Sequence, residues 1–315
     1  MVNRRHLRIK VLQALYAYFQ SDEENYRKTE TELLNSVEKM YDLYLYLLLT
    51  FGELKQIALI RAEEAKNKIR PTEEDLNPNM KFMDNAIVRI LEESAELRSI
   101  AEQRKINWMG DVNREMFRKM FLVIKDSETY FTFMNNELSG FEEDRAFALA
   151  LFKEEIANSR LLYNFFEEKS ISWLDDIDLM CSMVLKTIKG FSEEGPNRIL
   201  ELYRDAIDEK QFIVTLLRKS IMNEDENAKL IEKLTDNWEL ERIAKMDVIL
   251  MNMAITELQE FASIPKKVTL NEYIEISKYY STPKSNMFIN GILDKAIVHL
   301  EKEGKIRKAG RGLMQ

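Results

Sequence analysis

The residues best suited to chemistry are three arginines near the start of the chain. Arg4, Arg5 and Arg8 lie in a 20-residue segment that also holds Lys10 and no acidic residue. Arginine and lysine neutralise phosphates, and the counterions released on binding supply affinity for nucleic acids. Cations at a helix N-terminus also oppose the helix dipole, which is a mild local cost. The cluster therefore indicates either a polyanion contact or a solvated chain end.

The other reactive side chains give little sign of catalysis. The two histidines, His6 and His299, are far apart in sequence, no His/Cys cluster has metal-ligand spacing, and no glycine-rich phosphate loop is present. Cys181 lies in the apolar segment DLMCSMVL and is expected in the core. Paired acids such as Glu167–Glu168 are expected on a solvated surface, because 32% of the chain is charged. We expect no enzymatic activity, metal or cofactor.

The composition favours an all-α protein. The 315 residues include 45% hydrophobic residues but only 9 Gly and 5 Pro. A single cysteine excludes an internal disulfide and fits a reducing cytoplasm. The longest apolar run, 44–49, is far shorter than the roughly 20 residues that span a bilayer, and no signal-peptide apolar region follows the basic start. We therefore expect a cytoplasmic protein with no membrane segment.

The charge is unevenly distributed along the chain. The net charge is −8, yet residues 1–20 and 302–315 each carry +4, which leaves −16 for the rest. Two basic ends on an acidic body indicate a local polyanion contact rather than general affinity for nucleic acid.

Three helices would position these residues. Residues 3–20 have an apolar face at helical spacing, made of Leu7, Val11, Leu12, Leu15, Tyr16 and Phe19. Thr269 and Glu272 have capping-box spacing, which predicts that a second helix begins near Leu270. Pro283 ends that helix, and Ser285 or Asn286 can cap the third. Gly291, within the apolar face of the third helix, costs roughly 1 kcal/mol relative to alanine and so suggests a packing or binding reason.

The C-terminal segment resembles the signature of the NusB family of transcription antitermination factors. The resemblance rests on VTLNEYIEISK at 268–278 and SNMFINGILDK at 285–295, separated by a short break. RRHLRIKVLQALY at 4–16 is similar to the family's arginine-rich start, and 237–258 to the preceding helices. The resemblance implies a NusB-like helical bundle of residues 1–20 plus 205–300, an acidic helical insertion at 21–204 and a basic tail at 301–315.

The resemblance also implies an RNA site. Family members bind boxA, a short single-stranded RNA, and the matching positions are Arg4, Arg5, Arg8, Phe288 and Asn290. Phe288 is either a base-stacking residue or a core residue. Lys284 stands where relatives can carry an acid and adds positive charge, whereas His6 replaces an arginine. We expect the segment 288–291 to pack beside the first helix and share its surface.

NusE, a small-subunit ribosomal protein, is the partner that the resemblance implies. The matching partner-binding positions are Tyr16, Glu241 and Asp247. The two proteins would hold boxA-like RNA of nascent ribosomal transcripts, so that RNA polymerase elongates past termination signals. Two alternatives remain: a NusB-like domain of an rRNA-modifying enzyme, and a NusB-fold scaffold or rRNA-processing accessory protein without boxA specificity.

The insertion contains a possible internal repeat. Trp108, Trp173 and Trp238 are spaced by 65 residues, and Phe82, Phe147 and Phe212 precede them by 26 residues each. The pattern indicates either a duplicated helical pair or chance similarity among amphipathic helices. The tryptophans are expected to pack in the core. Helices are predicted at 28–66, 82–104, 110–135, 143–168, 172–190 and 196–222, with a linker at 70–78.

Overall fold

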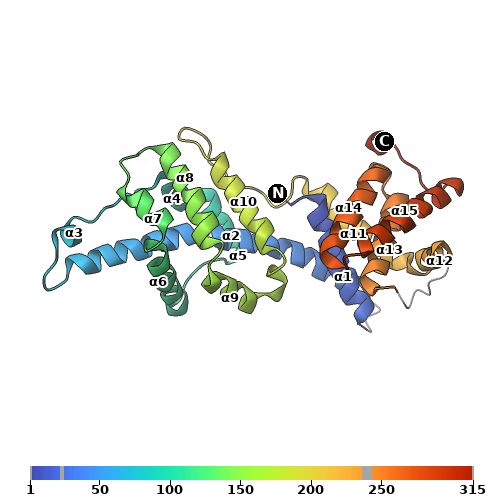
Figure 1. Ribbon diagram of the computed structural model, residues 1–315, viewed down its shortest axis with the longest axis horizontal. Helices are drawn as coiled ribbons and strands as arrows, with labels where there is room; N and C mark the ends of the chain where they lie inside the picture. Colours follow the sequence, from blue (N-terminus) through green and yellow to red (C-terminus); the bar gives the residue numbers. More distant parts are fainter. Residues whose placement is uncertain (1, 22–24, 236–242, 314–315) are drawn as a thin grey trace. The chain divides into compact units, whose positions relative to one another are not determined.

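The computed structural model describes residues 2–21, 25–235 and 243–313, and every regular element in these ranges is a helix (Figure 1). The predicted all-α class is therefore confirmed. The chain divides into two units, one of residues 38–202 and the other of residues 2–37 with 203–315. The boundary falls inside a helix, at residue 37, and not directly after residue 20.

The unit that contains both ends of the chain is built around one central helix. Its helices are α1 (Arg4–Gln20), the first turns of α2 (Tyr26–Lys66), α11 (Ala206–Met222), α12 (Glu224–Leu234), α13 (Lys245–Glu260), α14 (Lys266–Tyr280) and α15 (Ser285–Lys302). α13 packs against α1, α11, α12, α14 and α15. Figure 1 shows α1 from the start of the chain among these C-terminal helices.

α13 is central because almost its whole circumference is apolar. Leu250, Met251, Met253, Ala254 and Ile255 are all fully buried. A helix that is apolar on every side can only be stable when other helices surround it. The buried polar side chains Asn252 and Glu257 are hydrogen-bonded to neighbouring helices, so they also fix how those helices pack.

α1 presents most of the apolar face that its sequence predicts, with Tyr16 as an exception. Asn3 caps the helix by accepting a hydrogen bond from the His6 amide, and Leu7, Val11, Leu12 and Leu15 are fully buried. Tyr16 on the same helix is exposed. α1 packs on α11, α13 and α14.

The predicted capping box of α14 is wrong. The helix begins at Lys266, directly after Pro265, so Thr269 lies inside it. The Thr269 hydroxyl donates to Glu257 on α13, and Glu272 pairs with Arg5 on α1. Thr269 and Glu272 therefore bind side chains of α13 and α1 and do not cap α14. Pro283 falls between α14 and α15 as predicted, and α15 begins at Ser285.

The second unit contains the rest of α2 and shorter helices than the sequence predicts. They are α3 (Glu73–Leu76), α4 (Ala86–Glu93), α5 (Ala95–Arg104), α6 (Asp111–Lys125), α7 (Glu128–Asn135), α8 (Phe141–Leu151), α9 (Arg160–Lys169) and α10 (Ile177–Gly190). The predicted helices at 82–104, 110–135 and 143–168 are each interrupted. Ser94, Ser127 and Ser159 stand at the interruptions and cap the next helix with their hydroxyl oxygens.

Aromatic rings form the core of this unit. The Trp108 indole donates to the backbone carbonyl of Tyr46 at 3.1 Å, and Trp173 packs on the same tyrosine ring. Both tryptophans are buried, as predicted; Trp238 lies outside the described residues. Phe82 and Phe147 contact each other here, whereas Phe212 belongs to the other unit. The duplication stays a prediction.

α2 is long and apolar enough to cross a membrane, judged by length and composition alone. Of its most apolar 18-residue stretch, 61% is buried inside the protein. Such burial is typical of the core helix of a globular protein.

Candidate functional site

Arg8 makes the most enclosed ion pair at the start of α1. Its side chain is 2% exposed and donates from Nε and Nη2 to both oxygens of Glu257, at 2.7 and 2.8 Å. Thr269 and Tyr273 on α14 also donate to this carboxylate. The pair therefore joins α1, α13 and α14.

Electrostatics keep the Arg8 guanidinium charged. Burial alone would lower the pKa of Arg8, but the charge and hydrogen bonds of Glu257 outweigh it and raise that pKa above its ordinary value. Burial and the Glu257 charge raise the pKa of Tyr273 well above its ordinary value, so its hydroxyl stays a donor. The prediction that Arg8 contacts RNA does not fit this geometry, because its donors face the protein interior.

Arg4 and Arg5 reach solvent. Arg5 is 41% exposed and donates from Nε and Nη2 to the two oxygens of Glu272, both at 2.9 Å. Arg4 is 33% exposed, pairs with Asp208 on α11 at 2.5 Å, and lies over the Phe212 ring at 4.7 Å. Two of the three predicted arginines are thus available at the surface, each with one carboxylate.

His6 contributes no charge near neutral pH. Its Nδ1 atom is buried and has no hydrogen-bond partner in the described part of the chain. Burial, with the neighbouring Arg5 charge, lowers the pKa of His6 below its ordinary value of 6.5. The cationic cluster at pH 7 therefore consists of arginines.

The turn between α14 and α15 forms an exposed corner. Lys284 is exposed. Phe288 and Asn290 are half-buried, and Asn290 donates to Asp294 at 3.3 Å. Gly291 lies on the solvent side of α15, not inside its apolar face, and an added Cβ would meet no atom within 4 Å. Packing therefore does not explain this glycine.

Two exposed residues at the corner were missed from the sequence. Tyr279 is 81% exposed and Met287 is 73% exposed. The sequence held a signal for the first, since Tyr279 and Tyr280 are adjacent on a helix and cannot both face the core. We define the corner surface as Tyr279, Lys284, Met287, Phe288 and Gly291.

α14 links the start of α1, with Arg4 and Arg5, to the corner surface. It packs against both α1 and α15, and Glu272 from α14 meets Arg5 from α1. The expectation that the segment 288–291 packs beside the first helix needs correction, because α1 packs mainly on α11 and α13, whereas α15 packs on α12, α13 and α14.

Of the three predicted partner-binding residues, one is exposed, one is buried and one lies outside the described residues. Tyr16 is 40% exposed and available. Asp247 is buried and accepts hydrogen bonds from the hydroxyls of Ser281 and Ser285, so it holds the α14–α15 turn and does not face a partner. Its assignment to a partner surface is corrected accordingly. Glu241 lies outside the described residues.

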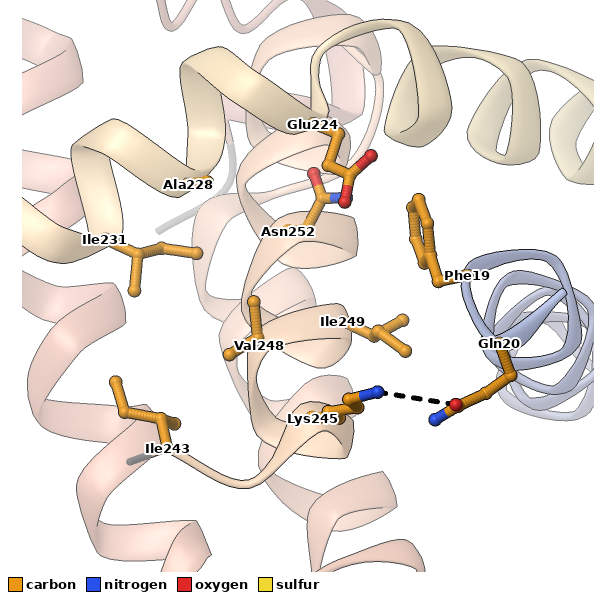
Figure 2. A pocket seen from close by; sticks show the side chains of 10 residues that line it. All are labelled: Phe19, Gln20, Glu224, Ala228, Ile231, Ile243, Lys245, Val248, Ile249 and Asn252. Carbon is orange, nitrogen blue, oxygen red and sulfur yellow. Dashed lines mark hydrogen bonds between the residues drawn. The ribbon is translucent and has the colours of Figure 1, made fainter. Parts of the chain in front are cut away.

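A pocket of about 450 Å³ opens between α1, α12 and α13 (Figure 2). Figure 2 shows the apolar side chains Phe19, Ile231, Val248 and Ile249 around it. Lys245 donates to Gln20 at 3.4 Å at one side. Phe19 is one turn along α1 from Tyr16, so an exposed aromatic and an apolar hollow occur on the same stretch of helix.

The single cysteine, Cys181, is buried. Burial raises the pKa of the Cys181 thiol to about 12, so it is a core residue and not a nucleophile at pH 7. Within the described ranges, no three His, Cys, Asp or Glu side chains gather in a way that could hold a metal ion.

Comparison with known proteins identifies relatives. The model of the NusB family matches residues 177–297. The chain is 43% identical over 117 residues to the transcription antitermination protein NusB of Salinibacter ruber, covering 36% of this chain and 73% of that protein. It is 44% identical over 108 residues to the protein of the same name from Chloroherpeton thalassium, covering 34% of this chain and 51% of the relative. No solved structure matches the chain significantly.

The matched region contains α11 to α14 and most of α15, and it also reaches back to α10 in the other unit. The family match thus includes α11, α13 and α14, which carry the acids that pair with the arginines of α1, and the corner surface. The chain belongs to the NusB family.

Proposed function

We propose that the protein is a transcription antitermination factor that binds boxA-like single-stranded RNA together with NusE. The observation that carries the proposal is the exposure of Arg4 and Arg5 at the start of α1, beside a helix that leads to an exposed corner with Lys284 and Phe288. The names of the relatives support the same role.

The chemistry of each side chain indicates which part of the RNA it would contact. Arg4, Arg5 and Lys284 bind phosphates, because guanidinium and ammonium groups neutralise them. Unstacked bases need flat surfaces, which Phe288 and the exposed Tyr279 ring provide. Gly291 allows the RNA backbone to approach α15 closely. Asn290 offers an amide for a base edge. Arg8 positions α1 and does not contact the RNA.

We propose that the partner binds along the second half of α1. Tyr16 and the apolar pocket next to Phe19 give an exposed aromatic group and a hollow for an apolar side chain. The complex acts by assembly: it holds RNA and partner for the RNA polymerase elongation complex, in the cytoplasm, and performs no chemical step. In this proposal residues 21–204 are an insertion into a NusB-like domain.

Fluorescence anisotropy of a labelled boxA RNA tests the proposal. We expect tighter binding to boxA than to a scrambled RNA of equal length, and tighter still with NusE present. Exchanging both Arg4 and Arg5 for alanine should weaken binding at least tenfold and reduce its salt dependence. Equal affinity for both RNAs would instead support a scaffold without boxA specificity.

A further inference from the structure

We infer that Asp208 and Glu272 determine the specificity of the RNA site by occupying Arg4 and Arg5 as internal anions that RNA phosphates must displace. This inference rests on the proposed function and adds a reason for RNA selectivity to it.

The geometry of the Arg5 pair is that of an arginine–phosphate contact. Both Glu272 oxygens accept hydrogen bonds from one guanidinium fork at 2.9 Å, as two phosphate oxygens would. The hydrogen bond with Glu272 raises the pKa of Arg5, so this guanidinium stays charged at any physiological pH. Glu272 also lies 3.7 Å from Arg8, which holds it in place.

The Arg4 pair has a single hydrogen bond, and its acid is more exposed than Glu272. Asp208 stands in the first turn of α11 and meets Arg4 at 2.5 Å, while its own side chain is 60% exposed. Asp208 can rotate into solvent at little cost when a phosphate arrives. The Arg8–Glu257 pair differs, since both side chains are buried and Glu257 holds two further donors. Exchange is therefore confined to Arg4 and Arg5.

The two acids neutralise the charge of Arg4 and Arg5. At the surface Arg4 and Arg5 face Asp208 and Glu272, so these two pairs have no formal net charge. Non-specific binding of nucleic acid is almost entirely electrostatic. A neutralised site suppresses it, whereas base contacts at the corner surface are unaffected. Only an RNA that makes both kinds of contact then binds well.

Glu272→Gln and Asp208→Asn test the inference, because each amide keeps the shape of the side chain and removes the charge. Affinity for boxA and for scrambled RNA is measured by anisotropy at several salt concentrations. We expect the affinity for scrambled RNA to rise roughly two- to fivefold in each variant. The boxA-to-scrambled ratio should fall, and the slope of log K against log salt should steepen by about 0.7 per phosphate gained.

Glu30→Gln is the matched control. Glu30 accepts both donors of Arg218 at 2.5 and 2.9 Å, so it forms the same kind of pair in the same unit. Arg218 lies ten residues after Asp208 on α11, which is about 15 Å along the helix. Charges at that distance are largely screened at physiological salt. We expect RNA binding by this variant to equal that of the original protein.

The outcomes separate the inference from the proposed function. If the protein fails to prefer boxA RNA, or if removing Arg4 and Arg5 has no effect, the proposed function fails and the inference with it. If those results hold but both acid variants bind scrambled RNA unchanged, only the inference is overturned. An equal gain in Glu30→Gln would also overturn it, because general charge would then be the cause.

Discussion

Arg5 and Arg8 are three residues apart on α1 and make similar bidentate pairs, yet only Arg5 reaches solvent. The spacing of the arginines predicted a cationic cluster but not this difference. Arg8 lies four and seven residues before Leu12 and Leu15, so it continues the buried face of α1. The acid that makes this burial possible, Glu257, is 249 residues away in sequence. A single sequence does not reveal that pairing.

Arg8→Met should destabilise the protein strongly. The substitution leaves the Glu257 carboxylate buried without its cation, which costs about 3–5 kcal/mol. Arg5→Met removes a pair at the surface and should cost less than about 1 kcal/mol. Urea unfolding followed by circular dichroism measures both. A loss for Arg8→Met as small as that expected for Arg5→Met would show that the Arg8 pair does not support the fold.

His6 should make stability depend on pH. The unfolded chain takes up a proton on His6 near pH 6.5, whereas the folded protein does so only at lower pH because its pKa is lowered. The unfolded state therefore gains protons first as the pH falls, and the free energy of unfolding decreases below about pH 6.5. His6→Gln should flatten the difference between pH 7.5 and pH 5.5 in the same unfolding experiment. An unchanged difference would assign the pH dependence to other groups.

At the scale of the elements, the corner between α14 and α15 was predicted as a break at Pro283 but not in its details. Asp247 on α13 accepts hydrogen bonds from Ser281 and Ser285 and so fixes the turn from outside it. A charge on an apolar helix needs a partner, but from the sequence Asp247 was assigned to a protein partner. The sequence did not indicate that the partners were two serines 34 and 38 residues later.

Gly291→Ala should separate stability from RNA binding. The position is helical and open, so alanine fits without a clash and should stabilise the protein by roughly 0.8–1 kcal/mol. If RNA approaches α15 at this position, the added methyl group should weaken boxA binding several-fold. Thermal unfolding and RNA anisotropy on the same sample test both effects. A stabilised protein with unchanged RNA affinity would remove Gly291 from the proposed site.

At the scale of the whole molecule, the sequence predicted an all-helical chain whose two ends work together. Contacts of α1 with α11, α13 and α14 agree with that expectation. Several helix boundaries in the 38–202 unit were missed, because serine caps and a π-helical turn at Phe152–Ile156 interrupt apolar patterns that continue across them. The spacing of apolar residues indicates which face of a segment is buried, but it does not indicate where a helix is interrupted.

The unit of residues 2–37 and 203–315 should fold without the other unit. Replacing residues 38–202 by a short glycine–serine linker removes one group of helices as a whole. The Tyr41 hydroxyl donates to the Leu200 carbonyl at 3.1 Å, so the two segments near the cut lie side by side and a short linker suffices. We expect a helical protein with cooperative thermal unfolding. A non-cooperative transition would show that the two units depend on each other for folding.

Photocrosslinking of boxA RNA that carries 4-thiouridine tests the central claim most directly, because it locates the RNA on the chain. With the full-length protein and NusE, digestion and mass spectrometry should place the crosslinks in peptides from the start of α1 and from the α14–α15 corner, including Tyr279 and Phe288. Crosslinks confined to residues 38–202, or crosslinks that scrambled RNA reproduces with equal yield, would contradict the claim that these two surfaces form the RNA site.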